Sequence, residues 1–93
     1  AVATVNDGIR FDSKKEANFY NDLKVREKAG EAIFFLRQVP LHLPGKTKMV
    51  VDFQVFNANG SVEFIDVKGM KTDMYKLKKR QVENIYPIKI KEV

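Results

Sequence analysis

Two aspartates interrupt runs of residues that otherwise have the composition of buried strands. Asp52 follows three apolar residues within 49–56 (MVVDFQVF), and Asp66 follows two apolar residues within 61–68 (SVEFIDVK). Aspartate is depleted in strands, and burial of a carboxylate is costly unless it is paired or bound to a metal. We therefore interpret these two acids as candidates for metal binding or acid–base chemistry.

A lysine follows the second of these acids. Lys68 lies two residues after Asp66, so the two side chains project from the same face of a strand. Acid-x-base tripeptides also begin at Asp12 and Asp22, as expected of a chain with 17 basic and 12 acidic residues. Only Asp66 and Lys68 lie on an apolar strand, where neither residue aids folding. The alternative is a buried Asp–Lys pair with no chemistry.

The loop between the two strands determines whether the aspartates meet. Residues 57–60 (NANG) fit a type I turn followed by a glycine in the left-handed conformation. That three-residue loop pairs Asn57 with Ser61 and places Asp52 opposite Asp66, with Cβ atoms about 5 Å apart. A two-residue loop would put the two acids on opposite faces. Facing carboxylates repel, so this register predicts a divalent cation or a raised pKa.

A third acid lies on the first predicted helix. Ser13 is a good N-cap and Gly30 a good C-terminal stop, so we expect a helix over residues 13–29. Glu16 shares one stripe of this helix with Tyr20 and Leu23, which directs it toward the sheet. Because Glu16 also lies three residues after Ser13, a capping box is the alternative role.

The remaining elements are expected to be strands and one further helix. Pro40 places the strand over 33–43 at a sheet edge or at a bend. Thr72 can cap a helix over 73–85, with Leu77, Val82 and Ile85 available for burial. The predicted strands are 33–43, 49–56, 61–68 and 88–93, with a turn at 44–48. The order is α-β-β-β-α-β, an α/β fold whose last two strands are parallel through a right-handed crossover.

Composition limits the chemistry. The 93 residues are expected to form one domain, 1–93, and 44% of them are hydrophobic, enough for a core. The chain has no cysteine and one histidine, His42, which excludes thiolate metal sites, a cysteine nucleophile and any site that needs two histidines. No apolar run is long enough to cross a membrane and no signal peptide opens the chain, so we expect no membrane partner and a cytoplasmic location.

The basic excess is concentrated near one segment. The chain has a formal charge of +5, and residues 71–80 (KTDMYKLKKR) contain five basic residues and one acid. Such a block indicates an anionic partner such as nucleic acid, or else a solvated helix face. The side chains of Lys76, Lys79 and Arg80 share one helix face, and Lys78 lies away from them. The candidate phosphate contacts are Lys14, Lys15, Lys71, Lys76, Lys79 and Arg80.

The element order and the spaced acids resemble the PD-(D/E)xK nucleases, which have a restriction-endonuclease-like fold. The resemblance rests on residues 11–20 (FDSKKEANFY), 38–43 (QVPLHL), 50–56 (VVDFQVF) and 63–72 (EFIDVKGMKT). It is nearest to small phage-type and Holliday-junction-resolvase-like single-domain nucleases. Val51 stands where the motif has proline, and Asp66 where glutamate is commoner. The resemblance implies a mixed central sheet flanked by helices.

The resemblance also implies roles for individual residues. Asp52, Asp66 and the backbone carbonyl of Val67 would bind Mg²⁺, with Mn²⁺ as a substitute, and Glu16 would complete the site. Lys68 would orient or activate the attacking water. The implied function is a Mg²⁺-dependent DNA endonuclease, directed by DNA structure rather than sequence, in phage or prophage DNA processing.

Several alternatives and secondary roles remain open at this point. A non-catalytic nucleic-acid-binding module could keep the same fold, and metal-independent RNA cleavage would need a histidine on an element other than that of His42. Cleavage of both strands would call for a homodimer or partner proteins, in the host cytoplasm if the chain is phage-encoded. Gln38 could face the site, whereas Phe34 and Phe35 are expected in the core.

Overall fold

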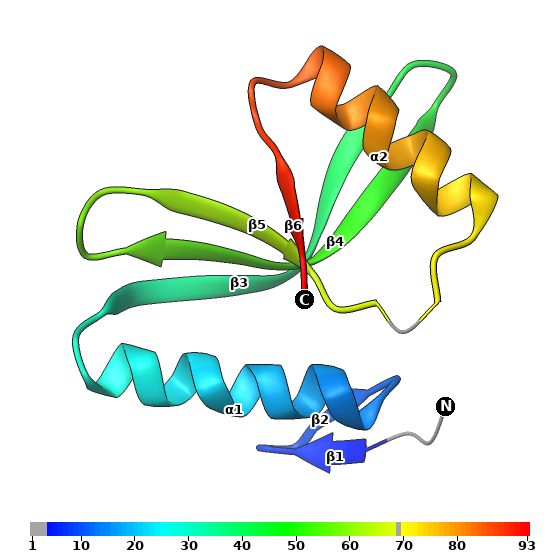
Figure 1. The fold of residues 1–93 in the computed structure, drawn as a ribbon. Helices are drawn as coiled ribbons and strands as arrows, with labels where there is room; N and C mark the ends of the chain where they lie inside the picture. The colour runs from blue at the N-terminus through cyan, green and yellow to red at the C-terminus, as the bar shows by residue number, and fades with distance from the viewer. Residues whose placement is uncertain (1–3, 69) are drawn as a thin grey trace.

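A computed structural model describes residues 4–68 and 70–93 of the chain, and Figure 1 shows the arrangement of its helices and strands. In chain order these are β1 (Thr4–Asn6), β2 (Ile9–Phe11), α1 (Lys14–Lys28), β3 (Ala32–Leu43), β4 (Thr47–Asn57), β5 (Val62–Asp66), α2 (Asp73–Ile85) and β6 (Ile90–Glu92). The predicted helices and strands are all present, with boundaries that differ by up to two residues. The fold is therefore mixed α/β, as expected.

The main sheet has the strand order β3-β4-β5-β6. β3, β4 and β5 are antiparallel neighbours, and β6 pairs parallel to β5 through the α2 crossover. Both the parallel last pair and the edge position of β3, which contains Pro40, were predicted. From α1 onward the elements follow the expected α-β-β-β-α-β order.

A small hairpin precedes α1 and was not predicted. β1 and β2 form a separate two-stranded sheet joined by Asp7 and Gly8, whose φ angles are +52° and +74°. Positive φ at both central residues is typical of a type I′ turn, for which Asp-Gly is a preferred sequence. The dipeptide was thus a local signal for this hairpin, although three-residue strands are too short for the alternation of apolar residues to show.

The predicted register of the central hairpin is confirmed. The Asn57 amide donates to the Ser61 carbonyl at 2.9 Å, and Gly60 has a φ of +91°. β4 and β5 pair through Phe53 with Ile65, and the pairing continues to Phe56 with Val62. The next residues toward the open end are Asp52 and Asp66, which therefore lie opposite each other.

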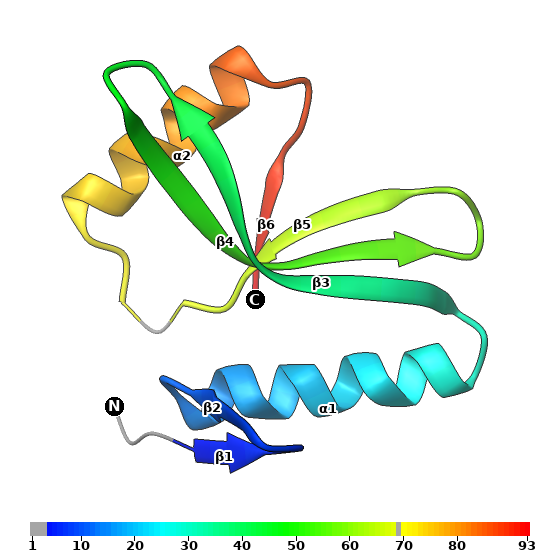
Figure 2. The same ribbon diagram turned by 180° about the vertical axis from the view of Figure 1, so that it is seen from behind.

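The sheet contributes to two separate apolar clusters. α1 packs on the first, which contains Leu23, Phe53 and Ile65, and Val82 of α2 packs in the second with Val51. Figures 1 and 2 show the β3–β4 hairpin end beside α2, while the first part of β3 lies along α1. Because Val51 and Phe53 belong to different clusters, the residue between them, Asp52, lies at the boundary of the two.

Two residues of α2 that were expected to be buried are instead exposed. Val82 is fully buried, but Leu77 and Ile85 are 42% and 52% exposed. α2 contacts the second cluster along a narrow stripe through Tyr75 and Val82, which are seven residues apart. At about 100° per residue, Leu77 is turned roughly 200° from Tyr75 and cannot share that stripe. The prediction that Leu77 and Ile85 would be buried was wrong, whereas that for Val82 is confirmed.

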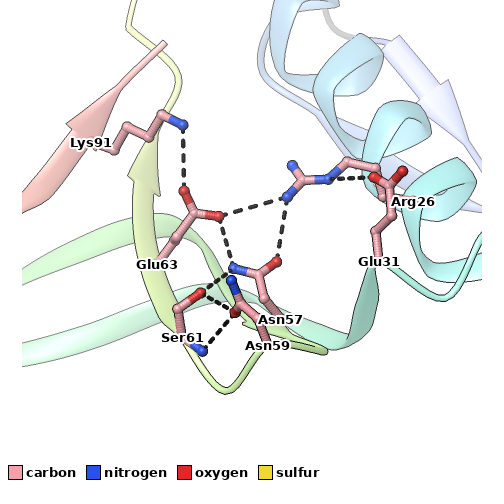
Figure 3. Close-up of polar contacts among 7 residues, drawn as sticks. All are labelled: Arg26, Glu31, Asn57, Asn59, Ser61, Glu63 and Lys91. Carbon is pink, nitrogen blue, oxygen red and sulfur yellow. Dashed lines mark hydrogen bonds and ion pairs between the residues drawn. The ribbon is translucent and has the colours of Figure 1, made fainter.

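A polar network joins α1, the central hairpin and β6, as Figure 3 shows. The Glu63 carboxylate accepts a hydrogen bond from the Asn57 side chain at 3.0 Å. It also pairs with Lys91 at 3.3 Å and with Arg26 at 3.6 Å. The hydrogen bond from Asn57 and the two cations outweigh partial burial, so the pKa of Glu63 lies below its ordinary value.

Glu63→Gln tests the contribution of this network to stability. A lowered pKa stabilises the fold above the unfolded-state pKa of about 4.3, and this stabilisation is lost as the pH falls through the folded-state value. We expect Glu63→Gln to lower the free energy of unfolding by about 1 kcal/mol at pH 7 and to match the wild type near pH 3. Urea denaturation at the two pH values measures this difference. Glu27→Gln, which removes an exposed pair with Lys24, is the control, and an equal loss at both pH values for Glu63→Gln would contradict the prediction.

Candidate active site

Asp52 and Asp66 each accept a hydrogen bond from the other's strand. The Asp52 amide donates to Asp66 Oδ1 at 2.9 Å, and the Val67 amide donates to Asp52 Oδ2 at 2.8 Å. Both aspartates are buried, and Asp66 is completely inaccessible to solvent. The register thus brings the two predicted acids together. Their side-chain oxygens accept hydrogen bonds from backbone amides at the point where the two strands stop pairing.

Glu16 reaches the same place from α1. The Gln38 side-chain nitrogen lies 3.2 Å from Glu16 Oε2 and 3.3 Å from Asp52 Oδ1, so one amide donates to both acids. Ser13 Oγ accepts from the Glu16 amide at 3.1 Å, which confirms Ser13 as the N-cap. The Glu16 side chain, however, turns toward the sheet. The structure therefore favours the sheet-facing role of Glu16 over the capping box.

Gln38 has an unusual backbone conformation for a residue in a strand. Its φ is +51°, although β3 and β4 stay in register on both sides, from Arg37 with Phe53 to Val39 with Val51. A left-handed conformation costs a residue other than glycine about 1–3 kcal/mol. This strain is localised opposite Asp52, where the Gln38 amide joins two carboxylates.

Arg37 is a site residue that the sequence analysis missed. Its guanidinium lies 3.6 Å from Glu16 Oε2 and 4.5 Å from the centre of the Phe11 ring. Burial raises the pKa of Glu16, and the nearby Asp52 charge raises it further, whereas Arg37 acts in the opposite direction. Arg37 thus favours the charged form of a buried acid next to a second acid.

Tyr75 connects Lys68 with Asp66 and was also missed. The Lys68 ammonium lies 5.0 Å from the centre of the Tyr75 ring. The Tyr75 hydroxyl and Asp66 Oδ2 are buried, and neither has a hydrogen-bond partner among the residues that the structure describes. Burial raises the pKa of Tyr75, and the charge of Asp66 raises it further. Tyr75 gave no signal in the sequence because it lies on another element, brought close only by the fold.

The electrostatics of Asp66 agree with the prediction for facing carboxylates. Burial is the main cause of its raised pKa, and the Asp52 charge adds to it. The Asp52 amide and the Lys68 charge act in the opposite direction. Among residues 4–68 and 70–93, Lys68 forms no ion pair with either aspartate. The geometry therefore gives no support to a buried Asp–Lys salt bridge.

The predicted phosphate contacts are distributed over several surfaces. Lys15 donates to the Lys68 carbonyl at 3.4 Å, close to the acids. Lys71 and Lys79 pair with Glu92 at 3.0 and 3.7 Å, so their charges are partly compensated. Lys14, Lys76 and Arg80 are exposed. The single histidine, His42, is exposed and lies away from the acids.

The donor set fits a divalent cation in its chemistry. Glu16, Asp52 and Asp66 offer carboxylate oxygens, which Mg²⁺ prefers, and Asp66 Oδ2 is a buried acceptor without a hydrogen-bond partner in the described part of the chain. Within the described part of the chain, no three acidic or histidine side chains are grouped closely enough to bind a metal ion. The acids form two linked pairs instead, Glu16 with Asp52 through Gln38 and Asp52 with Asp66 through the backbone.

Two substitutions at Gln38 separate backbone strain from its side-chain contacts. Gln38→Gly and Gln38→Ala both remove the amide between Glu16 and Asp52, but only glycine adopts positive φ without steric cost. We expect Gln38→Gly to be more stable than Gln38→Ala by about 1 kcal/mol in thermal or urea unfolding with EDTA. Both variants should gain more melting temperature from Mg²⁺ or Mn²⁺ than the wild type does, since the two acids have lost their shared donor. Equal stability of the two variants would show that the strand carries no strain at this position.

Comparison with known proteins identifies the family to which this chain belongs. No curated protein and no solved structure matches the chain. No helix in the parts of the chain that the structure describes is long and apolar enough to cross a membrane. A family model described as "Protein of unknown function (DUF1064)" matches residues 1–92. The match covers almost the whole sequence, and the chain belongs to the DUF1064 family.

Proposed function

We propose that this protein is a divalent-cation-dependent endonuclease that hydrolyses phosphodiester bonds in DNA. The observation that carries the proposal is the contact of the buried Asp52 and Asp66 across β4 and β5, in which Asp66 Oδ2 has no hydrogen-bond partner within 3.5 Å among residues 4–68 and 70–93. Burial of such an oxygen costs free energy unless it is protonated, accepts a hydrogen bond or binds a cation. The resemblance of the acids and Lys68 to the PD-(D/E)xK pattern supports the same chemistry.

In this proposal the acids hold the cation. Asp52, Asp66 and Glu16 would bind Mg²⁺ or Mn²⁺ together with the Val67 carbonyl. The bound cation would supply Lewis-acid stabilisation of negative charge on the phosphate. Gln38 holds Glu16 and Asp52 together when no cation is bound, and its exposed position in β3 lets its amide leave without disturbing the core.

Lys68 is the residue that would act on water. Its ammonium lies over the Tyr75 ring, where the negative face of the aromatic ring attracts a cation. From this position beside Asp66 the ammonium can orient a water molecule by hydrogen bonding and stabilise negative charge near the phosphate. Tyr75 acts through Lys68, as a positioning residue.

The wider setting is part of the same proposal. The net charge of +5 favours contacts with phosphates, which carry no sequence information, so we propose recognition of DNA structure rather than sequence, as in phage or prophage DNA processing. Cytoplasmic action, in a host cell if the chain is phage-encoded, would follow. Cleavage of both strands would require a second copy of the chain or a partner protein.

One observation favours a second candidate, a nucleic-acid-binding module without catalysis. Both oxygens of Asp52 already accept hydrogen bonds, one from Gln38 and one from Val67. A carboxylate satisfied in this way can serve the fold without a cation. The two candidates differ in their response to Mg²⁺ and to loss of Lys68.

Cleavage assays distinguish the two candidates. Labelled branched, single-stranded and duplex DNA should be cut with Mg²⁺ or Mn²⁺ and left intact with EDTA. We expect Asp52→Asn and Lys68→Ala each to lower the cleavage rate by about 100-fold or more, because cation binding and the orientation of water are lost. Glu31→Gln and Lys28→Ala are the controls, since they remove one exposed acid and one exposed base at the end of α1 opposite to Glu16.

Thermal unfolding of the same variants separates catalysis from structure. Asp52→Asn relieves the repulsion between two adjacent acids but replaces one of the two oxygens that accept from Gln38 and Val67, so without a cation the two effects oppose and its melting temperature should change little. Full cleavage activity together with a melting temperature lowered by several degrees would favour the non-catalytic candidate. Cleavage by the wild type in EDTA would exclude the proposed cation.

A further inference from the structure

A groove runs between the β3–β4 turn and the first turns of α2. Its volume is about 600 Å³. The β-strand side is contributed by residues 46–50 and the helix side by residues 72–78. The turn that forms one wall has a defined shape, with φ of +80° at Gly45 and +59° at Lys46 and a hydrogen bond from Thr47 Oγ1 to the Pro44 carbonyl at 3.1 Å.

The charge of this groove is positive and uncompensated. Lys46, Lys48 and Lys78 line it, and no acidic residue does. Within residues 4–68 and 70–93, none of the three takes part in an ion pair, whereas Lys71 and Lys79 pair with Glu92. Three unpaired lysines in one groove attract an anionic partner.

Apolar side chains alternate with these lysines. Met74 is 59% exposed and Val50 38% exposed, although both lie in the groove. A partner that fits must therefore present negative charge and apolar surface side by side. An unpaired DNA strand does this, since its phosphates meet lysines while its unstacked bases cover apolar side chains. A duplex offers mainly its phosphates because its base faces are hidden in the stack.

The groove adjoins the candidate active site through one residue. Tyr75 lines the groove, and the same side chain lies under the Lys68 ammonium and beside Asp66. A strand in the groove would therefore lie on one side of Tyr75, with the Lys68 ammonium on the face of the same ring.

We propose that the groove between the β3–β4 turn and α2 binds a single-stranded segment of DNA and leads it to the acidic site. This inference rests on the proposed nuclease function and specifies its substrate, DNA with an unpaired arm or gap. The segment would be bound through Lys46, Lys48 and Lys78 on its phosphates and through Met74 on its bases.

Binding measured without cleavage tests the proposal. Fluorescence anisotropy in EDTA would compare a labelled single strand, a blunt duplex and a duplex with a single-stranded arm. Combined replacement of Lys46, Lys48 and Lys78 by alanine should weaken binding of the single strand and the armed duplex at least about tenfold. The slope of log K against log [salt] should become shallower by about 2, at ~0.7 per phosphate contact on a single strand. Blunt-duplex binding should change far less.

Two further variants make the test specific. Replacement of Lys24, Lys28 and Lys89 by alanine removes the same charge from exposed lysines outside the groove and should leave single-strand affinity within about twofold. Met74→Ser should weaken single-strand binding by roughly threefold to tenfold, the loss of about 1 kcal/mol of apolar burial, with no change in salt slope because this contact carries no charge. Circular-dichroism melts of all variants would verify that they are folded.

The outcomes separate this inference from the proposed function. An equal effect of the two triple variants, or an equal loss for blunt duplex and single strand, would overturn the groove proposal while leaving cation-dependent cleavage intact. Competition by poly-glutamate at the same concentration as DNA would overturn it in favour of an acidic protein partner. Groove-dependent binding by a wild-type protein that never cleaves DNA with Mg²⁺ would support the groove and refute the nuclease.

Discussion

The exchange of hydrogen bonds between Asp52 and Asp66 is the constraint on which the rest of the structure depends. β4 and β5 stop pairing at this point, and each carboxylate accepts a backbone amide from the opposite chain segment. Without these bonds the two buried carboxylates would lose their hydration with nothing to replace it. Burying a charge in this way costs far more free energy than leaving it exposed to water. The contact therefore determines where β4 separates from β5. Beyond that point β4 pairs only with β3, in the part of the hairpin that lies beside α2.

That separation explains the two apolar clusters and the strain at Gln38. The same long strand contributes Phe53 to the cluster under α1 and Val51 to the cluster under α2. β3 follows β4 through the change of direction, and the left-handed backbone of Gln38 occurs opposite Asp52. Buried acids and a strained backbone lower stability, and such features are typically retained at functional sites.

The site and the groove join through α2. Tyr75 contributes one face to the Lys68 ammonium and one side to the lysine-lined groove. Neighbouring lysines of α2 therefore have different surroundings. Lys79 pairs with Glu92, whereas Lys78 lines the groove. Charge in the sequence alone does not distinguish these two roles, since it depends on what each lysine faces. The proposals for catalysis and for single-strand binding thus share one helix and can fail separately.

The sequence by itself determined the features that depend on near neighbours along the chain. Ser13 capped α1, residues 57–60 set the register, and that register brought Asp52 opposite Asp66. The tertiary structure alone decided the contacts of Arg37 and Tyr75 with the acids, the left-handed backbone of Gln38, and the exposure of Leu77. Turn chemistry and helix caps act over three or four residues, so a single sequence displays them. Strain, ion pairing and burial depend on segments that are distant in the chain. Only the packing of the two apolar clusters brings those segments together.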